Sequence, residues 1–351
     1  MIRIVDIARK ANVSPTTVSM VLNYPAEYIP VGEETSQKVL RVAQQLGYCR
    51  NDIARAMVTG KSRMVGFVMP SLQEEYVSLI LEGILGGAES SGFFVKVLRA
   101  PPPKEIHKTI QQWIQMRPSG FICTNLEKSV MDEIHALLAR CQIPLVTVDN
   151  SFIQPNGTYV ISDDVQGIHQ AIEHLAALGH SRIGFISGSP QEAWAIRRAE
   201  AYQKAMSKLN LSVPEGYLQC IKGKWRDGID AVVRSLLMRS DRPTAMACAG
   251  DWMAMAVIRT AWHLDLHVPR SLSVVGYGNL LFSELTAPPL TTIAQPFAEM
   301  GLNAMQHLTQ QIEQKKSSAL ESPLIQHFPT RLVVRESTGP VAKSISHATE
   351  F

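Results

Sequence analysis

Residues 4–23 read IVDIARKANVSPTTVSMVLN and contain the signals for two short helices joined by a tight turn. Between Ile4 and Ala11, apolar residues recur at helical spacing, which predicts a first helix with one buried face. Ser14 is a favourable N-cap, and Pro15 suits the first position of a second helix. Two short helices connected in this way are a candidate helix-turn-helix.

The second predicted helix presents small and polar side chains on the side away from its apolar residues. In a helix-turn-helix, early residues of the second helix contact base edges, and hydroxyl groups can reach bases or phosphates. The helix pattern alone is more typical of an ordinary solvated helical surface. The candidate DNA contacts in this segment are Ser14, Pro15, Thr16, Thr17, Ser19, Met20 and Asn23.

The positive charge of the chain is concentrated at its start. The 351 residues carry a formal net charge of +3, and the first 61 residues hold eight basic and five acidic side chains. The rest of the chain is therefore neutral overall. A basic end on a neutral body suggests a polyanion partner at that end, although an excess of three charges also arises by chance.

Two more helices are predicted before residue 61. Val39 to Leu46 carry apolar residues at helical spacing, and Gly47 is a typical stop. Asn51 can begin a short helix that Gly60 ends. This second segment has only two turns, so it needs a partner in order to form.

These segments together resemble the LacI/GalR family. The resemblance covers residues 4–14, 17–19, 21–23 and 46–48, and it continues into the hinge at Asn51, Ala54, Arg55 and 59–61. It implies that the second helix enters the major groove and that Pro15, Thr16 and Met20 read bases. Methionine can touch a thymine methyl but cannot donate to guanine, so we expect an unusual operator half-site at the base that Met20 faces.

The family hinge implies how the DNA is held. Two dimer-related hinge helices, about residues 51–59 here, fold together on the duplex and wedge an apolar side chain into the minor groove. The resemblance therefore implies a homodimer on a pseudo-palindromic double-stranded operator. The hinge contacts that it implies are Asn51, Ala54, Arg55 and Met57, of which Met57 occupies the wedge position.

From about residue 62 the pattern changes to apolar strands that alternate with amphipathic helices, which predicts parallel sheets with helices on both sides. The length allows two such sheets. The helix candidates are Ile168–Leu178 and Ile229–Leu237. The strand candidates are Val65–Met69, Phe121–Thr124, Leu145–Val148, Arg182–Ile186, Ala245–Ala249 and Ser273–Gly276.

The core also resembles the family, whose core is similar to a periplasmic sugar-binding protein with two lobes and three crossovers. The expected domains are a helix-turn-helix domain over 1–60 and an effector-binding and dimerisation core over 61–335. Residues 336–351 are expected to be a polar tail. We expect crossovers near 161, 291 and 325, so that lobe N combines about 62–161 with 292–325 and lobe C covers about 162–291.

In open α/β sheets, ligands bind beyond the carboxyl ends of the strands. Strand ends and the family resemblance together indicate the effector contacts Ser71, Thr124, Asp149, Arg198, Trp225, Asp251 and Gln295. Three of these have simpler readings. Trp225 could cap the core of its lobe, Asp251 could be a helix N-cap, and Arg198 could be an ordinary surface residue.

Two departures from the family bear on the effector. Gly250 and Gly278 stand where relatives often carry asparagine and aspartate. Both changes remove ligands for sugar hydroxyls, and one removes a negative charge. A site with less acid and more room favours a bulkier or anionic effector, such as a sugar acid or sugar phosphate.

Other function classes lack their signals. There is no Gly-rich phosphate loop, no GxSxG elbow and no metal-ligand cluster, so we expect neither an enzyme nor a cofactor. Five widely spaced cysteines, no signal peptide and no run of ~18 apolar residues indicate a cytoplasmic protein at the bacterial nucleoid. The predicted function is a transcription repressor of a carbohydrate or sugar-acid operon. The alternative is a cytosolic sugar-binding or enzyme-like α/β protein without an operator.

Overall fold

The computed structural model describes residues 2–23, 30–48, 62–149, 152–190, 192–221, 228–314 and 322–341. The chain divides into two compact units, one containing the first three helices and the other containing both β-sheets. The predicted fold class, a helical headpiece followed by an α/β core of two sheets, is confirmed.

The headpiece is built on α1 (Ile4–Ala11), α2 (Pro15–Asn23) and α3 (Glu33–Gln45). Their apolar faces form one small core around Ile7, Val18 and Val39, which are fully buried. Ser14 caps α2, because its Oγ accepts a hydrogen bond from the amide of Thr17 at 3.0 Å. The local signals that predict the helix-turn-helix therefore act as expected.

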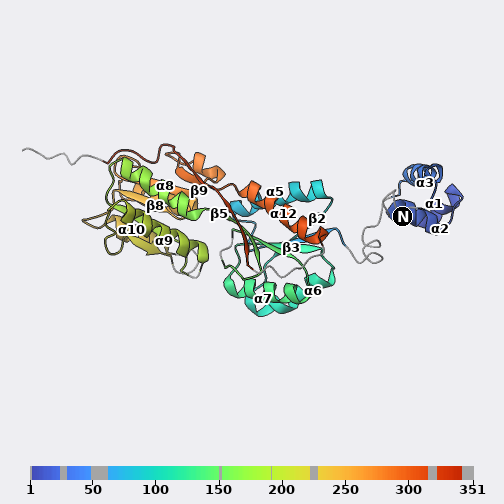
Figure 1. The fold of residues 1–351 in the computed structure, drawn as a ribbon. Coiled ribbons are helices and arrows are strands. Elements are labelled where there is room, and N and C mark those ends of the chain that lie inside the picture. Colours follow the sequence, from blue (N-terminus) through green and yellow to red (C-terminus); the bar gives the residue numbers. More distant parts are fainter. Residues whose placement is uncertain are drawn as a thin grey trace, which may run out of the picture. The chain divides into compact units, whose positions relative to one another are not determined.

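The sheet of lobe N has six parallel strands in the order β11-β5-β4-β3-β1-β2. Helices α5 and α12 cover one face, and α6 and α7 cover the other (Figure 1). The strands are β1 (Met64–Met69), β2 (Phe94–Arg99), β3 (Gly120–Thr124), β4 (Leu145–Val148), β5 (Thr158–Ser162) and β11 (Leu324–Phe328). The helices are α5 (Glu75–Ser91), η2 (Pro103–Glu105), α6 (Ile106–Gln115), α7 (Lys128–Arg140) and α12 (Phe297–Glu313).

The sheet of lobe C has the order β12-β10-β9-β8-β6-β7, and only the β12–β10 pair is antiparallel. Its strands are β6 (Ile183–Ser187), β7 (Leu218–Cys220), β8 (Ala245–Cys248), β9 (Ser273–Gly278), β10 (Thr291–Ala294) and β12 (Arg331–Val333). Its helices are α8 (Asp164–Ala177), α9 (Ala193–Lys208), α10 (Ile229–Leu237), α11 (Asp251–His263) and η3 (Leu281–Glu284). Helix α8 begins four residues earlier than expected, because the Asp163 carboxylate caps it by accepting from the Gln166 amide at 2.9 Å.

Two of the expected crossover positions are wrong by several residues. The chain passes between the lobes after β5, after β10 and after β11. Residues 291 and 325 lie inside β10 and β11, so β10 belongs to lobe C and the third crossing follows Phe328. These strands are short. Strand β10 is placed by its pairing with β9 and β12, and β11 by its pairing with β5, which lies far away in the sequence.

The expected polar tail is also partly wrong. Residues 336–341 pack on lobe C, and Ser337 is fully buried. The Ser337 hydroxyl donates to the Val274 carbonyl at 2.6 Å and accepts from the Thr291 amide at 2.8 Å. The amide of Val341 donates to the Leu178 carbonyl at 3.0 Å. Hydrogen bonds therefore fix this segment to lobe C, and the sequence did not predict this because the segment has no apolar pattern. Residues 342–351 lie outside the described residues.

Candidate DNA-binding surface and effector site

The predicted DNA contacts on α2 differ in how exposed their side chains are. Pro15 and Thr16 are exposed, while Ser19 and Met20 are half-buried. The Ser14 and Thr17 hydroxyls hydrogen-bond to each other at 2.8 Å, so they are partly engaged in the cap. The Asn23 side chain and the hinge contacts Asn51, Ala54, Arg55 and Met57 lie outside the described residues. All of these contacts stay predictions.

Three neighbouring strands of lobe N end in polar side chains. Thr124 is the last residue of β3, Asp149 follows β4, and Ser162 is the last residue of β5. The Ser162 hydroxyl donates to Asp149 Oδ1 at 3.2 Å. Asp149 itself has a left-handed backbone with φ +50°. The strand ends therefore gather hydroxyl and carboxylate groups at one edge of the sheet, as the topology predicts.

A chain of hydrogen bonds joins this edge to lobe C. Gln295, in the crossing after β10, donates from Nε2 to Ser162 Oγ at 2.7 Å. Its Oε1 accepts from Arg198 Nη2 at 3.3 Å. Arg198 lies on α9 and is buried. The structure thus brings Asp149, Gln295 and Arg198, three of the residues expected from the sequence, into one network.

The network continues into an acidic residue that sequence reasoning missed. Arg198 Nε donates to Asp164 Oδ1 at 2.8 Å, and Arg198 Nη1 donates to the Ala249 carbonyl at 2.7 Å. The Arg198 guanidinium lies 3.8 Å from the ring centre of Tyr277, whose hydroxyl donates to Asp164 at 3.0 Å. Arg197 Nε also donates to Asp164, at 3.1 Å. Asp164 follows directly after the N-cap of α8, which is the signal that could have found it.

Burial and charge act differently on the two carboxylates of the network. Burial, followed by the nearby Asp164 charge, raises the pKa of Asp149 to about 6. Burial opposes ionisation of Asp164 as well, but Arg198 and Arg197 outweigh it and lower the pKa of Asp164. Asp164 is therefore the firmly ionised partner of the two guanidinium groups.

The other predicted effector contacts differ in how they are used. Thr124 is fully buried, and its hydroxyl has no hydrogen-bond partner among the described residues. Ser71 is half-buried and accepts from the Gln73 amide at 3.1 Å. Asp251, the first residue of α11, accepts from the Thr292 hydroxyl at 2.5 Å and from the Leu280 amide at 2.8 Å. Trp225 lies outside the described residues.

The two glycines that depart from the family have different surroundings. A Cβ at Gly250 would meet nothing within 4 Å. Gly278 has φ +131°, a conformation that side-chain-bearing residues rarely adopt. An aspartate at 278 would therefore require the backbone to change. The glycine at this position thus allows a backbone conformation as well as removing a side chain.

The segment after Gly278 holds the lobes together on one side. Leu280 is buried in the core of lobe N although it belongs to a loop of lobe C. The Leu281 amide donates to Glu75 Oε1 at 2.6 Å. The Trp252 and Phe282 rings lie 4.2 Å apart and both pack against the same lobe N core. This loop is therefore a second connection between the lobes, distinct from the polar network.

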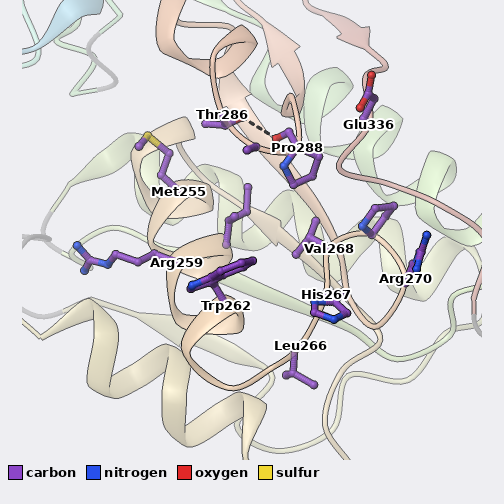
Figure 2. A pocket seen from close by; sticks show the side chains of 13 residues that line it. Met255, Arg259, Trp262, Leu266, His267, Val268, Arg270, Thr286, Pro288 and Glu336 are labelled. Carbon is purple, nitrogen blue, oxygen red and sulfur yellow. Dashed lines mark hydrogen bonds between the residues drawn. The ribbon is translucent and has the colours of Figure 1, made fainter.

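A separate groove of about 680 Å³ lies on lobe C (Figure 2). Met255 and Trp262 of α11 lie on one side of it, opposite Val268 and Pro288. Arg259 also lines it, but its side chain extends away from the groove and donates to Asp230 of α10 at 2.6 Å. The side chain of Trp262 is 71% exposed. Sequence reasoning missed this surface, although the helical spacing of Met255, Ile258 and Trp262 is a signal that could have found it.

Two further features concern the described residues as a whole. No grouping of His, Cys, Asp or Glu in that part of the chain could hold a metal ion. Among its helices, none combines the length and the apolar character that crossing a bilayer requires.

A helix-turn-helix unit followed by two sheets of this topology defines a DNA-binding regulator with a periplasmic-binding-type core. Residues 3–51 match the family described as bacterial regulatory proteins, lacI family. Residues 172–338 match the periplasmic binding protein-like domain. The chain belongs to the lacI family, as its relatives below also show, and it is a DNA-binding transcription regulator.

Relatives match along nearly the whole chain. The transcriptional regulator DegA of Bacillus subtilis is 30% identical over 342 residues, covering 96% of this chain and 98% of DegA. The transcriptional repressor PurR of Mannheimia succiniciproducens is 28% identical over 345 residues, covering 97% and 100%. The crystal structure of the lac repressor dimer bound to operator and the anti-inducer ONPF is 27% identical, with a TM-score of 0.81 and coverage of 96% and 99%.

Proposed function

We propose that this protein is a homodimeric repressor that binds a pseudo-palindromic operator and responds to a small sugar-type effector held between its lobes. The observation that carries the effector site is the hydrogen-bonded chain from Asp149 through Ser162 and Gln295 to Arg198. It lies at the carboxyl ends of the strands, where ligands of such sheets bind. We place the protein in the bacterial cytoplasm, where its DNA partner is, and assign it no enzymatic activity.

The proposed mechanism couples this chain of hydrogen bonds to the DNA. An effector that takes over hydrogen bonds of Gln295 or Ser162 changes the contact between the lobes. A shift of lobe N in each protomer changes the spacing of the two hinge segments, about residues 51–59, and hence their ability to fold on the duplex. The effector then alters operator affinity only by as much as it prefers one lobe arrangement.

The proposed dimer uses exposed apolar surfaces on both lobes. On lobe C it uses the groove around Trp262. On lobe N it uses β2, an edge strand whose Phe94 and Val97 are exposed. Exposed apolar patches of this kind commonly mark protein contacts. A related lac repressor was crystallised as a dimer on its operator, which supports the same assembly here.

The test is selection of binding sites from random double-stranded DNA with the full chain, followed by titration at several salt concentrations. We expect a two-fold symmetric site whose affinity falls steeply as salt rises, because bound phosphates release counterions. Candidate sugars are then added to the complex. A chain that prefers no duplex sequence, with or without sugars, would refute the proposed function.

A further inference from the structure

The effector network contains its own counter-charges. Arg197 and Arg198 bring two positive charges, and Asp149 and Asp164 bring two carboxylates. Each nitrogen of the Arg198 guanidinium already donates within the protein, to Asp164, Ala249 and Gln295. The buried cation that a negatively charged ligand would seek is therefore already neutralised.

We propose that Asp164 sets the charge selectivity of the effector site, so that the site accepts a neutral polyhydroxylated ligand and rejects an anionic one. Asp164 does so by pairing with both guanidinium groups at once. It is a positioning residue, because it acts through Arg197 and Arg198. This inference rests on the proposed function only in that the network is the effector site.

Among the described residues, the groups of the network left for a ligand are the Thr124 hydroxyl, the Asp149 carboxylate and one cationic donor, Arg197 Nη1, which belongs to a guanidinium already paired with Asp164. The Thr124 hydroxyl is buried without a partner among the described residues, which points to a ligand that completes its hydrogen bonding. The Asp149 carboxylate accepts from a hydroxyl, that of Ser162, and can accept from ligand hydroxyls in the same way.

Further acid lies near Asp149, because the charges of Asp149, Glu74 and Glu192 all raise the pKa of the buried Tyr76. Burial raises the pKa of Glu192, and the charges of Glu127 and Glu74 add to that rise. These three carboxylates come from both lobes, since Glu192 precedes α9 and the other two precede α7 and α5. An anionic ligand would add to this repulsion, whereas a neutral one would not.

The proposal revises the effector class expected from Gly250 and Gly278. Their loss of side-chain ligands suggested less acid in the site. The structure supplies acid from a different element, because Asp164 at the start of α8 contacts Arg198. The two glycines then leave more room in the effector site, while Asp164 keeps the site from having a net positive charge.

The experiment uses the purified full chain and inorganic phosphate as the anionic probe, with binding followed by calorimetry and by thermal shift. We expect no saturable phosphate binding by the wild type. Asp164→Asn frees both guanidinium groups and should therefore bind phosphate saturably. Its affinity should exceed the upper limit measured for the wild type by at least about tenfold, which is the gain from one charge-assisted hydrogen bond. The matched control is Glu173→Gln, which removes an exposed carboxylate from the same helix.

Two results would overturn the proposal. One is saturable phosphate binding by the wild type that disappears in Arg198→Gln. The other is phosphate binding by folded Asp164→Asn no tighter than that of Glu173→Gln. If Asp164→Asn does not fold, Asp149→Asn is tested in its place. This variant leaves Arg198 paired with Asp164, so it should still bind no phosphate, and saturable phosphate binding by it would show that Asp164 does not set the selectivity.

A second comparison uses D-glucose and D-gluconate, a neutral and an anionic ligand of similar size. If the wild type binds either sugar, D-glucose should bind more tightly, and the preference should narrow or reverse in Asp164→Asn. These measurements involve no DNA. A failed operator selection would therefore count against the proposed function alone, and a failed phosphate test would count against the role of Asp164 alone.

Discussion

At the scale of single residues, Asp149 links the chemistry of the site to pH. Its pKa is raised to about 6 from the ordinary 3.8, mainly by burial. The folded state therefore holds this proton more tightly than the unfolded chain does. The resulting stabilisation is fully present below about pH 4 and is lost as the pH rises to 6.

Replacing Asp149 by asparagine should remove this pH dependence. Between pH 4 and pH 7 the wild type should lose about 1–3 kcal/mol of unfolding free energy relative to Asp149→Asn, with the difference confined to that window. Denaturant unfolding at a series of pH values measures it. Asp265→Asn is a matched control, because Asp265 is exposed and has a similar left-handed backbone, with φ +56°. Parallel pH profiles for the wild type and Asp149→Asn would contradict the assignment.

Met20 is expected to shape the operator at one base. Because its thioether cannot donate hydrogen bonds, Met20→Arg should shift the selected base toward guanine, with a discrimination of about 1–3 kcal/mol. Site selection with both proteins under the same salt conditions measures the change. Exposed Val5→Arg on α1 adds the same charge elsewhere in the headpiece and should leave the selected base unchanged. Identical half-sites for wild type and Met20→Arg would place Met20 away from the bases.

At the scale of elements, the close packing of α5 against α12 depends on glycine. A Cβ at Gly83 would lie 1.9 Å from the Ala298 carbonyl oxygen, and one at Gly301 would lie 2.1 Å from the Ile80 carbonyl oxygen. The two helices therefore meet through their backbones. This contact fixes α12 on lobe N directly after a crossing between the lobes, and thereby places the crossing residue Gln295 at the site.

Two alanine substitutions on α5 separate packing from helix propensity. Gly83→Ala should destabilise the protein by about 1–3 kcal/mol, because backbone atoms must move apart. Gly86→Ala, where a Cβ meets nothing within 4 Å, should be neutral or stabilise by up to about 1 kcal/mol. Thermal and denaturant unfolding of both variants measure this. Equal effects would show that α5 and α12 adjust freely.

At the scale of the whole molecule, the proposed dimer interface includes the exposed groove around Trp262. Trp262→Asp should weaken self-association by more than tenfold, since aromatic residues in apolar pockets commonly contribute 2 kcal/mol or more. Analytical ultracentrifugation measures the dimer, and operator binding should fall with it. Met238→Asp is the control, because Met238 is 67% exposed on the same lobe but does not line the groove. An undiminished dimer in Trp262→Asp would move the interface elsewhere.

The sequence alone determined what depends on neighbours along the chain. Residues a few positions apart are enough to predict the Ser14 cap, the apolar faces of α1 and α2, and the buried strands β1, β3, β4 and β8. The family resemblance follows from the same kind of local segment. Tertiary structure decided what depends on distant partners. The pairing of β10 with β12 and of β11 with β5 assigns these strands to their lobes. Buried Ser337 anchors the expected tail, and Asp164 on α8 pairs with Arg198 on α9. Local pattern cannot carry this information, because the energy of each such contact belongs to two segments that only the folded chain brings together.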